Sequence, residues 1–359
     1  MRYVTLDLMR GLAALVVLLF HMNYMLGSET HLIAKGYLAV DFFFILSGFV
    51  IAANYHVSVR PTLTRRDFIS ARVARLWPLF LLATLAGCVA VTMKATRDFG
   101  YFDAQNVIAS LFLNILMLPS PLQTFGIDRL FFFNGASWSV FLEMAINLVF
   151  LVVLRRLPLK PLLFLAACFA LVLAGVAWVH GSLDGGWSSA NFYVGVARVL
   201  FGFTAGMVVY LVSVRGTFRL GSSATTIAVA GLALSFSIDG GWIAECVLVI
   251  AIYPLLVLLA AAGQLGSRTA RIGGWLGDIS YSVYLLQTPA MMAASWACPL
   301  LTGRKIAEFA PWSGIAFAVA LLGLSYMCWR GFELPARRIL RPWLASAPRR
   351  KVPATEGAA

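Results

Sequence analysis

Residues 36–54 read GYLAVDFFFILSGFVIAAN, an apolar run whose one charged residue is Asp41. About 20 mostly apolar residues are the length that an α-helix needs to cross the hydrocarbon core of a bilayer. Further runs of this kind are residues 8–27, 76–94, 137–154, 161–179, 191–213, 222–238, 242–262, 275–297 and 311–329. The sequence therefore predicts an all-α, polytopic membrane helix bundle with about ten transmembrane helices.

The composition excludes other classes of protein. Of the 359 residues, 61% are hydrophobic and 12% charged, and the mean hydropathy is +0.86, too apolar for a soluble domain. Disorder is also excluded, because disordered chains are poor in aromatic residues and this chain has 26 Phe and 10 Trp. The net charge of +13 does not indicate a nucleic-acid partner, because the basic residues lie between the apolar runs. The expected partner is the lipid bilayer.

The basic residues also orient the predicted helices. With the N-terminus inside, 21 of the 28 Lys and Arg residues fall in cytoplasmic segments and six fall outside, and Arg198 lies within a span. This asymmetry predicts that both termini are cytoplasmic. The stretch 103–118, DAQNVIASLFLNILML, is too short to cross comfortably and precedes Pro119, so we expect an interfacial or re-entrant helix.

One domain accounts for nearly the whole chain. We expect residues 1–345 to form a membrane-embedded domain and residues 346–359 to form a flexible basic cytoplasmic tail. The residues after the first apolar run, HMNYMLGSETH, lack a small-residue cleavage site, so the first helix is expected to stay in place.

Four ionisable residues within the predicted spans are singled out as candidates, namely His21, Asp41, Glu143 and Arg198. Such groups cost roughly 2.5–3.5 kcal/mol each in a bilayer and mark functional sites by default. On the predicted topology they lie at one depth, roughly 10 Å from the outer surface, with Gln287 at a similar level. The sequence thus predicts a catalytic or transport site in that layer.

Each of these residues also has a structural interpretation. Asp41 would brace a helix junction, Arg198 would neutralise Glu143 in an ion pair, and His21 would be a hydrogen-bonded packing residue. The sequence alone leaves these alternatives open.

A second polar cluster is predicted at the cytoplasmic side. Arg72 and Arg75 in RVARLWP are three residues apart, on one helix face, and Arg10 lies near the start of the first span. Guanidinium groups paired in this way bind phosphate, although contact with phospholipid headgroups is the alternative. Eleven residues separate Arg10 from His21, roughly 16 Å along a helix, which is the order of length of a pantetheine arm.

Six blocks in order resemble the membrane acyltransferases of the acyltransferase-3 family, which O-acylate glycans and other hydroxyl-bearing acceptors. The blocks are LDLMRGLAALVVLLFHM, GYLAVDFFFILSGFVIA, RVARLWP, SWSVFLE, LGDISYSVYLLQTP and FELPARR. The resemblance covers nearly the whole chain. It implies an enzyme that moves an acyl group, most simply acetyl, from acyl-CoA to a carbohydrate hydroxyl without a metal. It also implies the bacterial inner membrane as the location.

The resemblance suggests a role for each candidate residue. His21 is the expected general base, and Glu143 or Asp41 is expected to orient it. The expected CoA-phosphate ligands are Arg10, Arg72 and Arg75. The expected substrate-binding residues are Trp138, Arg198, Tyr281 and Gln287, with Arg198 stabilising an oxyanion.

Two features depart from the family pattern. Gln287 stands where the family usually has a histidine, and Met144, Ile146 and Asn147 replace a second acidic residue and an aromatic pair. Two other functions stay open from the sequence. They are a proton-coupled transporter of a small polar solute, and a glycan-binding scaffold without catalysis.

Overall fold

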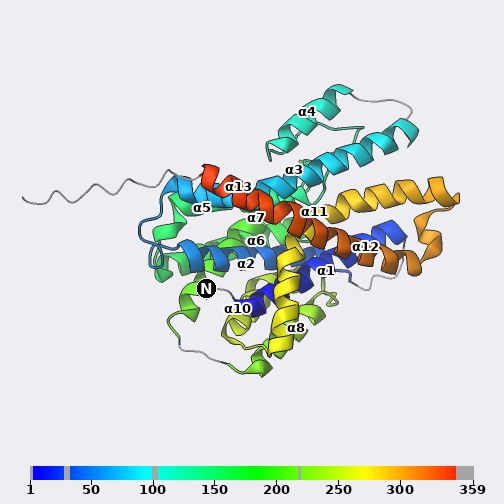
Figure 1. Ribbon diagram of the computed structural model, residues 1–359. Coiled ribbons are helices and arrows are strands. Elements are labelled where there is room, and N and C mark those ends of the chain that lie inside the picture. The colour runs from blue at the N-terminus through cyan, green and yellow to red at the C-terminus, as the bar shows by residue number, and fades with distance from the viewer. Residues whose placement is uncertain (1–2, 28–32, 99–103, 217–219, 345–359) are drawn as a thin grey trace, which may run out of the picture.

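The computed structural model describes residues 3–27, 33–98, 104–216 and 220–344. Within these ranges the chain forms helices joined by turns and loops, without a β-strand, so the predicted all-α bundle is confirmed (Figure 1). The predicted tail at 346–359 lies outside the described residues.

The helices follow the apolar runs closely. Their bounds are α1 Val4–Leu26, α2 Ala39–Tyr55, α3 Arg65–Asp98, α4 Ala104–Ile115, α5 Ser137–Val152, α6 Leu159–His180, α7 Phe192–Ser213, α8 Ser222–Ser235, α9 Gly241–Val247, α10 Tyr253–Ala262, α11 Ser267–Thr302, α12 Trp312–Cys328 and α13 Leu334–Leu344. Short π-helical segments, Leu248–Ile252 and Trp329–Glu333, connect α9 to α10 and α12 to α13.

Among the described residues, seven helical segments are long and apolar enough to cross a membrane. They are Val4–Leu26, Gly36–Tyr55, Arg65–Met93, Leu159–His180, Phe192–Ser213, Gly241–Ala262 and Trp312–Leu344. The predicted spans 137–154 and 222–238 form shorter helices, and the predicted span 275–297 lies within the 36-residue α11. The count of ten spans and their orientation stay predictions. Within the stretch 103–118, residues Ala104–Ile115 form the 12-residue α4 beside α3, and the membrane position of this helix also stays a prediction.

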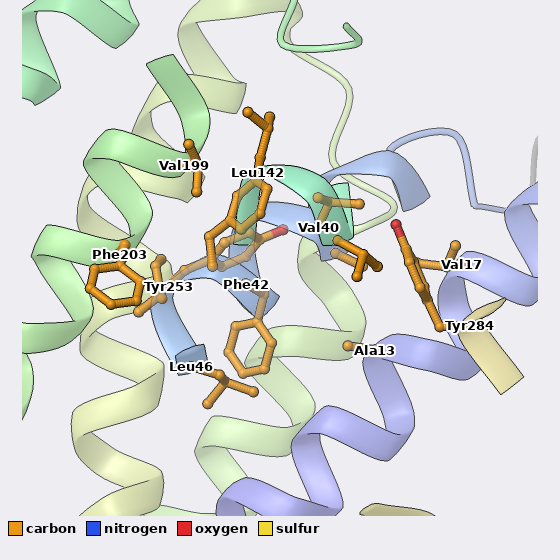
Figure 2. Packing of buried hydrophobic residues seen from close by; sticks show 14 of the residues in the cluster. Ala13, Val17, Val40, Phe42, Leu46, Leu142, Val199, Phe203, Tyr253 and Tyr284 are labelled. Carbon is orange, nitrogen blue, oxygen red and sulfur yellow. The ribbon is translucent and has the colours of Figure 1, made fainter. Parts of the chain in front are cut away.

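Two closely packed helix pairs form the centre of the bundle, α1 with α11 and α2 with α7. Glycines permit the close approach, because a Cβ at Gly48 would overlap the backbone of Phe203 and a Cβ at Gly206 would overlap that of Ile45. Small residues at such contacts are typical of membrane helices, where van der Waals packing replaces the hydrophobic drive between helices. Side chains from α1, α2, α5, α7, α10 and α11 pack into one core around these pairs (Figure 2).

Candidate active site

A cavity of about 320 Å³ lies between α1, α2, α3, α5 and α11. Five of the candidate residues line it, and they come from four of these helices. They are Arg10 of α1, Arg72 and Arg75 of α3, Glu143 of α5 and Tyr281 of α11. The predicted phosphate ligands and one predicted catalytic carboxylate therefore share one space. We call the end of the bundle near the start of α1 the Arg10 end, and the opposite end the His21 end.

Arg10 is held against α11, the helix that packs along α1. Its Nη2 donates to the Gly277 carbonyl oxygen at 2.6 Å, and its Nε donates to Ser280 Oγ at 3.1 Å. It also forms an ion pair with Asp7 at 3.0 Å. These contacts fix the guanidinium in the cavity wall.

Arg72 and Arg75 lie one turn apart on α3, and both line the cavity as their spacing predicts. The Arg72 guanidinium lies over the Tyr55 ring, 6.0 Å from its centre. Its buried Nε has no hydrogen-bond partner in the described part of the chain. A buried N–H without a partner costs free energy, so an anionic ligand that accepts from it would be stabilised here.

Glu143 lies deeper in the cavity and accepts a hydrogen bond of 2.9 Å from Ser47 Oγ of α2. Beside it, the Tyr281 hydroxyl donates to the Leu76 carbonyl oxygen at 2.7 Å, which ties α11 to α3. The carboxylate also interacts electrostatically with Arg72. Glu143 thus balances positive charge in the cavity and fixes the local arrangement of α2 and α5.

Tyr284, Ser139 and Phe43 form one layer of the cavity lining. The Tyr284 hydroxyl is hydrogen-bonded to Ser139 Oγ at 2.7 Å, and its ring packs edge-on against Phe43 at 5.6 Å between ring centres. Gln287 is the next residue on this side of α11, three positions beyond Tyr284, and its Nε2 donates to the Tyr284 carbonyl oxygen at 3.0 Å.

His21 lies beyond this layer and does not line the cavity. Its Nδ1 is 3.0 Å from the Val17 carbonyl oxygen. Because a carbonyl only accepts, Nδ1 carries the proton and Nε2 of the neutral ring has a free lone pair. The Gln287 side chain lies within hydrogen-bonding reach of the imidazole, and Arg129 acts on it electrostatically. The α1 backbone, rather than a carboxylate, therefore orients His21.

Asp41 and Arg198 form a buried ion pair that the sequence did not predict. Arg198 Nε and Nη2 donate to the two Asp41 carboxylate oxygens at 2.9 and 2.7 Å. Nη1 donates to the Gly185 carbonyl oxygen and Nη2 also donates to that of Tyr37, and the centre of the Trp138 ring lies 5.4 Å from the guanidinium. The side chains are 0% and 1% exposed.

This pair corrects two sequence-based expectations. Arg198 does not pair with Glu143, and Asp41 is hydrogen-bonded to Arg198 rather than to His21. Gly202 explains the first difference, because it lets α7 pack directly against α2 at the level of Asp41. Trp138 belongs to this cluster and not to the cavity lining.

Glu245, in the second half of α9, is a further buried carboxylate that was not singled out from the sequence. It accepts hydrogen bonds from Lys35 Nζ at 2.8 Å, the Leu183 backbone N–H at 2.6 Å and the Tyr37 hydroxyl at 2.5 Å. Partial burial lowers the pKa of Lys35, but the ion pair with Glu245 raises it further, so the net pKa lies above the ordinary lysine value. These bonds connect the segments at the His21 end of the bundle. Glu245 could have been found from the sequence, because it is a charged residue inside the apolar run 242–262.

Other residues were within the quoted blocks but were not singled out. Ser139 belongs to SWSVFLE and Tyr284 to LGDISYSVYLLQTP, and both are polar groups in apolar surroundings. Arg129 lies in a loop where no periodicity points to it. Among the described residues, no group of three or more His, Cys, Asp or Glu side chains is arranged to hold a metal ion.

Comparison with known proteins identifies the family. The profile of the acyltransferase-3 family, described as an acyltransferase domain, matches residues 3–330. The exopolysaccharide production protein ExoZ of Rhizobium meliloti (strain 1021) is 29% identical over 298 residues, 78% of this chain and 83% of ExoZ. Acyltransferase MdmB of Streptomyces mycarofaciens is 28% identical over 280 residues, 71% of this chain and 68% of MdmB.

A shorter relative, protein 2 in the picA locus of Rhizobium radiobacter, is 34% identical over 181 residues, 48% of this chain and 93% of the relative. No solved structure matches the chain. The residues that match the family profile include the cavity lining, His21 and the Asp41–Arg198 pair. The chain therefore belongs to the acyltransferase-3 family of membrane acyltransferases and is an enzyme of that class.

Proposed function

We propose that this enzyme transfers an acyl group, most simply acetyl, from acyl-CoA to a hydroxyl of a carbohydrate such as a cell-surface polysaccharide. The observation that carries the proposal is the single continuous helix α1. It holds Arg10 in the cavity wall and, eleven residues further on, His21 outside the cavity lining, with its Nδ1 bonded to the Val17 carbonyl oxygen. The name of ExoZ, an exopolysaccharide production protein, supports a polysaccharide acceptor.

The CoA phosphates bind Arg10, Arg72 and Arg75 at the Arg10 end. Arginine suits this task because its planar fork donates two parallel hydrogen bonds to a phosphate. The pantetheine arm then extends through the cavity toward His21, a rise of roughly 16 Å along α1. The thioester must pass the layer of Tyr284, Ser139 and Phe43, so this layer opens during the reaction.

His21 Nε2 removes the proton from the acceptor hydroxyl, whose oxygen attacks the thioester carbonyl carbon. The new C–O bond forms an ester, the C–S bond breaks, and the CoA thiolate takes a proton from the imidazolium. The Val17 carbonyl holds the ring in the tautomer that this step needs. Glu143 acts as a positioning residue that balances the charge of Arg72.

The proposed setting is the bacterial inner membrane with the Arg10 end in the cytoplasm, because acyl-CoA is made there. This orientation follows from the asymmetric distribution of Lys and Arg.

The test uses membranes that contain the full chain and acetyl-CoA labelled in the acetyl group. We expect label in envelope carbohydrate that alkali releases, and no such label in membranes without the protein. Solute flux without a covalent product would instead support a transporter, and neither product nor flux would support a scaffold.

Replacing Arg72 or Arg75 with alanine is expected to raise the KM for acetyl-CoA roughly 10- to 100-fold, because each removes a charge-assisted hydrogen bond of about 1.5–3 kcal/mol. Transfer kinetics at saturating acceptor measure this KM. Arg65→Ala is the matched control, since Arg65 is exposed on the same helix and does not line the cavity.

Acetyl-pantetheine, which lacks the nucleotide phosphates, provides the second arm of this experiment. The Arg72 and Arg75 variants should use it as well as the unsubstituted enzyme does. An equal loss with both donors would contradict a role in phosphate binding.

A further inference from the structure

Two loops meet at the His21 end of the bundle, residues 116–136 before α5 and residues 181–191 before α7. The Leu130 N–H donates to the Trp187 carbonyl oxygen at 3.1 Å. The Asp128 carboxylate accepts from the Ser189 N–H at 3.0 Å and its Oγ at 2.8 Å. Slight burial raises the pKa of Asp128, but these hydrogen bonds lower it further, so the net pKa is lowered. The loops therefore form one connected surface.

The first loop is also anchored to the helix that carries Gln287. Asn134 Nδ2 donates to the Leu285 carbonyl oxygen of α11 at 3.0 Å, and this bond is buried. The loop surface is thereby fixed relative to the turn of α11 that faces His21. A substrate bound on the two loops would have a defined position relative to the imidazole.

Trp187 and Arg129 form an exposed pair on this surface. The Arg129 guanidinium lies 5.7 Å from the centre of the Trp187 ring, and the Trp187 side chain is 40% exposed. In the described part of the chain, the guanidinium makes no ion pair and no hydrogen bond, so its donors are available. Arg129 nevertheless lies close enough to His21 to act on it electrostatically.

This combination matches the chemistry of a sugar ring. An aromatic face packs against the C–H groups of a pyranose, and a guanidinium fork donates hydrogen bonds to neighbouring hydroxyls. We infer that Trp187 and Arg129 bind the acceptor sugar and present one of its ring hydroxyls to His21 Nε2. The inference rests on the proposed function and adds the position of the acceptor.

A purely structural role would not require the pair to lie on the loop surface that Asn134 joins to the helix carrying Gln287. Trp312, at the start of α12, is 75% exposed and serves as a comparison at the same end of the bundle. Arg304 lies over the Phe309 ring at 5.9 Å and is paired with Glu308 at 3.6 Å. These residues provide matched tryptophan and arginine controls.

The experiment measures transfer from labelled acetyl-CoA, in membranes, to alkali-deacylated surface polysaccharide of the source bacterium. Trp187→Ala and Arg129→Ala are expected to raise the acceptor KM about tenfold, the effect of losing one aromatic or charged contact. The KM for acetyl-CoA should not change. Trp187→Phe should restore most of the acceptor affinity, since it retains an aromatic face. Trp312→Ala and Arg304→Ala should leave both constants unchanged.

Each outcome decides between the two proposals. Transfer with an unchanged acceptor KM in both alanine variants overturns the assignment of Trp187 and Arg129 and leaves the proposed function standing. An equal rise in the two control variants also overturns it. No transfer by the unsubstituted enzyme overturns the proposed function and the assignment together. If the alanine variants do not accumulate in the membrane, Trp187→Leu and Arg129→Gln are measured instead, because they keep side-chain bulk and remove the aromatic face or the charge, and unchanged acceptor KM values again overturn the assignment.

Discussion

His21→Ala is expected to lower the turnover number for acyl transfer by about 10²- to 10⁴-fold, the contribution of a positioned general base. The physical reason is the loss of Nε2, which the hydrogen bond from Nδ1 to the Val17 carbonyl leaves free to accept a proton. Initial rates with labelled acetyl-CoA and saturating acceptor measure this loss. The KM for acetyl-CoA should change little, because the predicted phosphate ligands line the cavity and His21 does not.

His180→Ala is the matched control, because His180 is a half-buried histidine at the end of α6 whose Nδ1 is paired with the Tyr193 hydroxyl. It should retain full activity. A His21→Ala variant that keeps more than about a tenth of the turnover number would contradict general base catalysis by this residue.

Arg198→Leu is expected to destabilise the folded protein by about 3–5 kcal/mol, because it leaves the Asp41 carboxylate buried without a counter-charge. The lost contacts include both hydrogen bonds to Asp41 and those to the Gly185 and Tyr37 carbonyl oxygens. Unfolding of the detergent-solubilised protein measures the change. Asp41→Leu should have a similar effect, since it leaves the Arg198 guanidinium buried without a counter-charge.

The double variant Asp41→Leu with Arg198→Leu tests the physical argument. It should recover much of the lost free energy of unfolding, because neither charge remains buried alone. Arg304→Leu is the control and should cost less than about 1 kcal/mol, since its pair with Glu308 is exposed. Stable single variants that lose acyl transfer would instead support the substrate role predicted for Arg198 from the sequence.

Helix positions were predictable because apolar run length depends only on local sequence. The run 36–54 corresponds to α2, which spans Ala39–Tyr55, and Arg72 and Arg75 share a helix face because of their spacing. The family was also recognisable from its blocks of sequence, since these keep their order along the chain. The loop pair Trp187 and Arg129 had no comparable signal, because residues 58 positions apart meet only through loop packing.

The sequence by itself determined an all-helical membrane acyltransferase with arginines and a histidine spaced along one helix. Only the tertiary structure decided the partners of the buried charges. Helical periodicity specifies which residues share a face, but it does not specify which helix packs against that face. Gly202 and Gly48 bring α7 against α2, so Asp41 meets Arg198, while Glu143 on α5 faces the cavity and Ser47. Among the described residues, the group bonded to His21 Nδ1 is the Val17 carbonyl oxygen of the same helix and not a carboxylate.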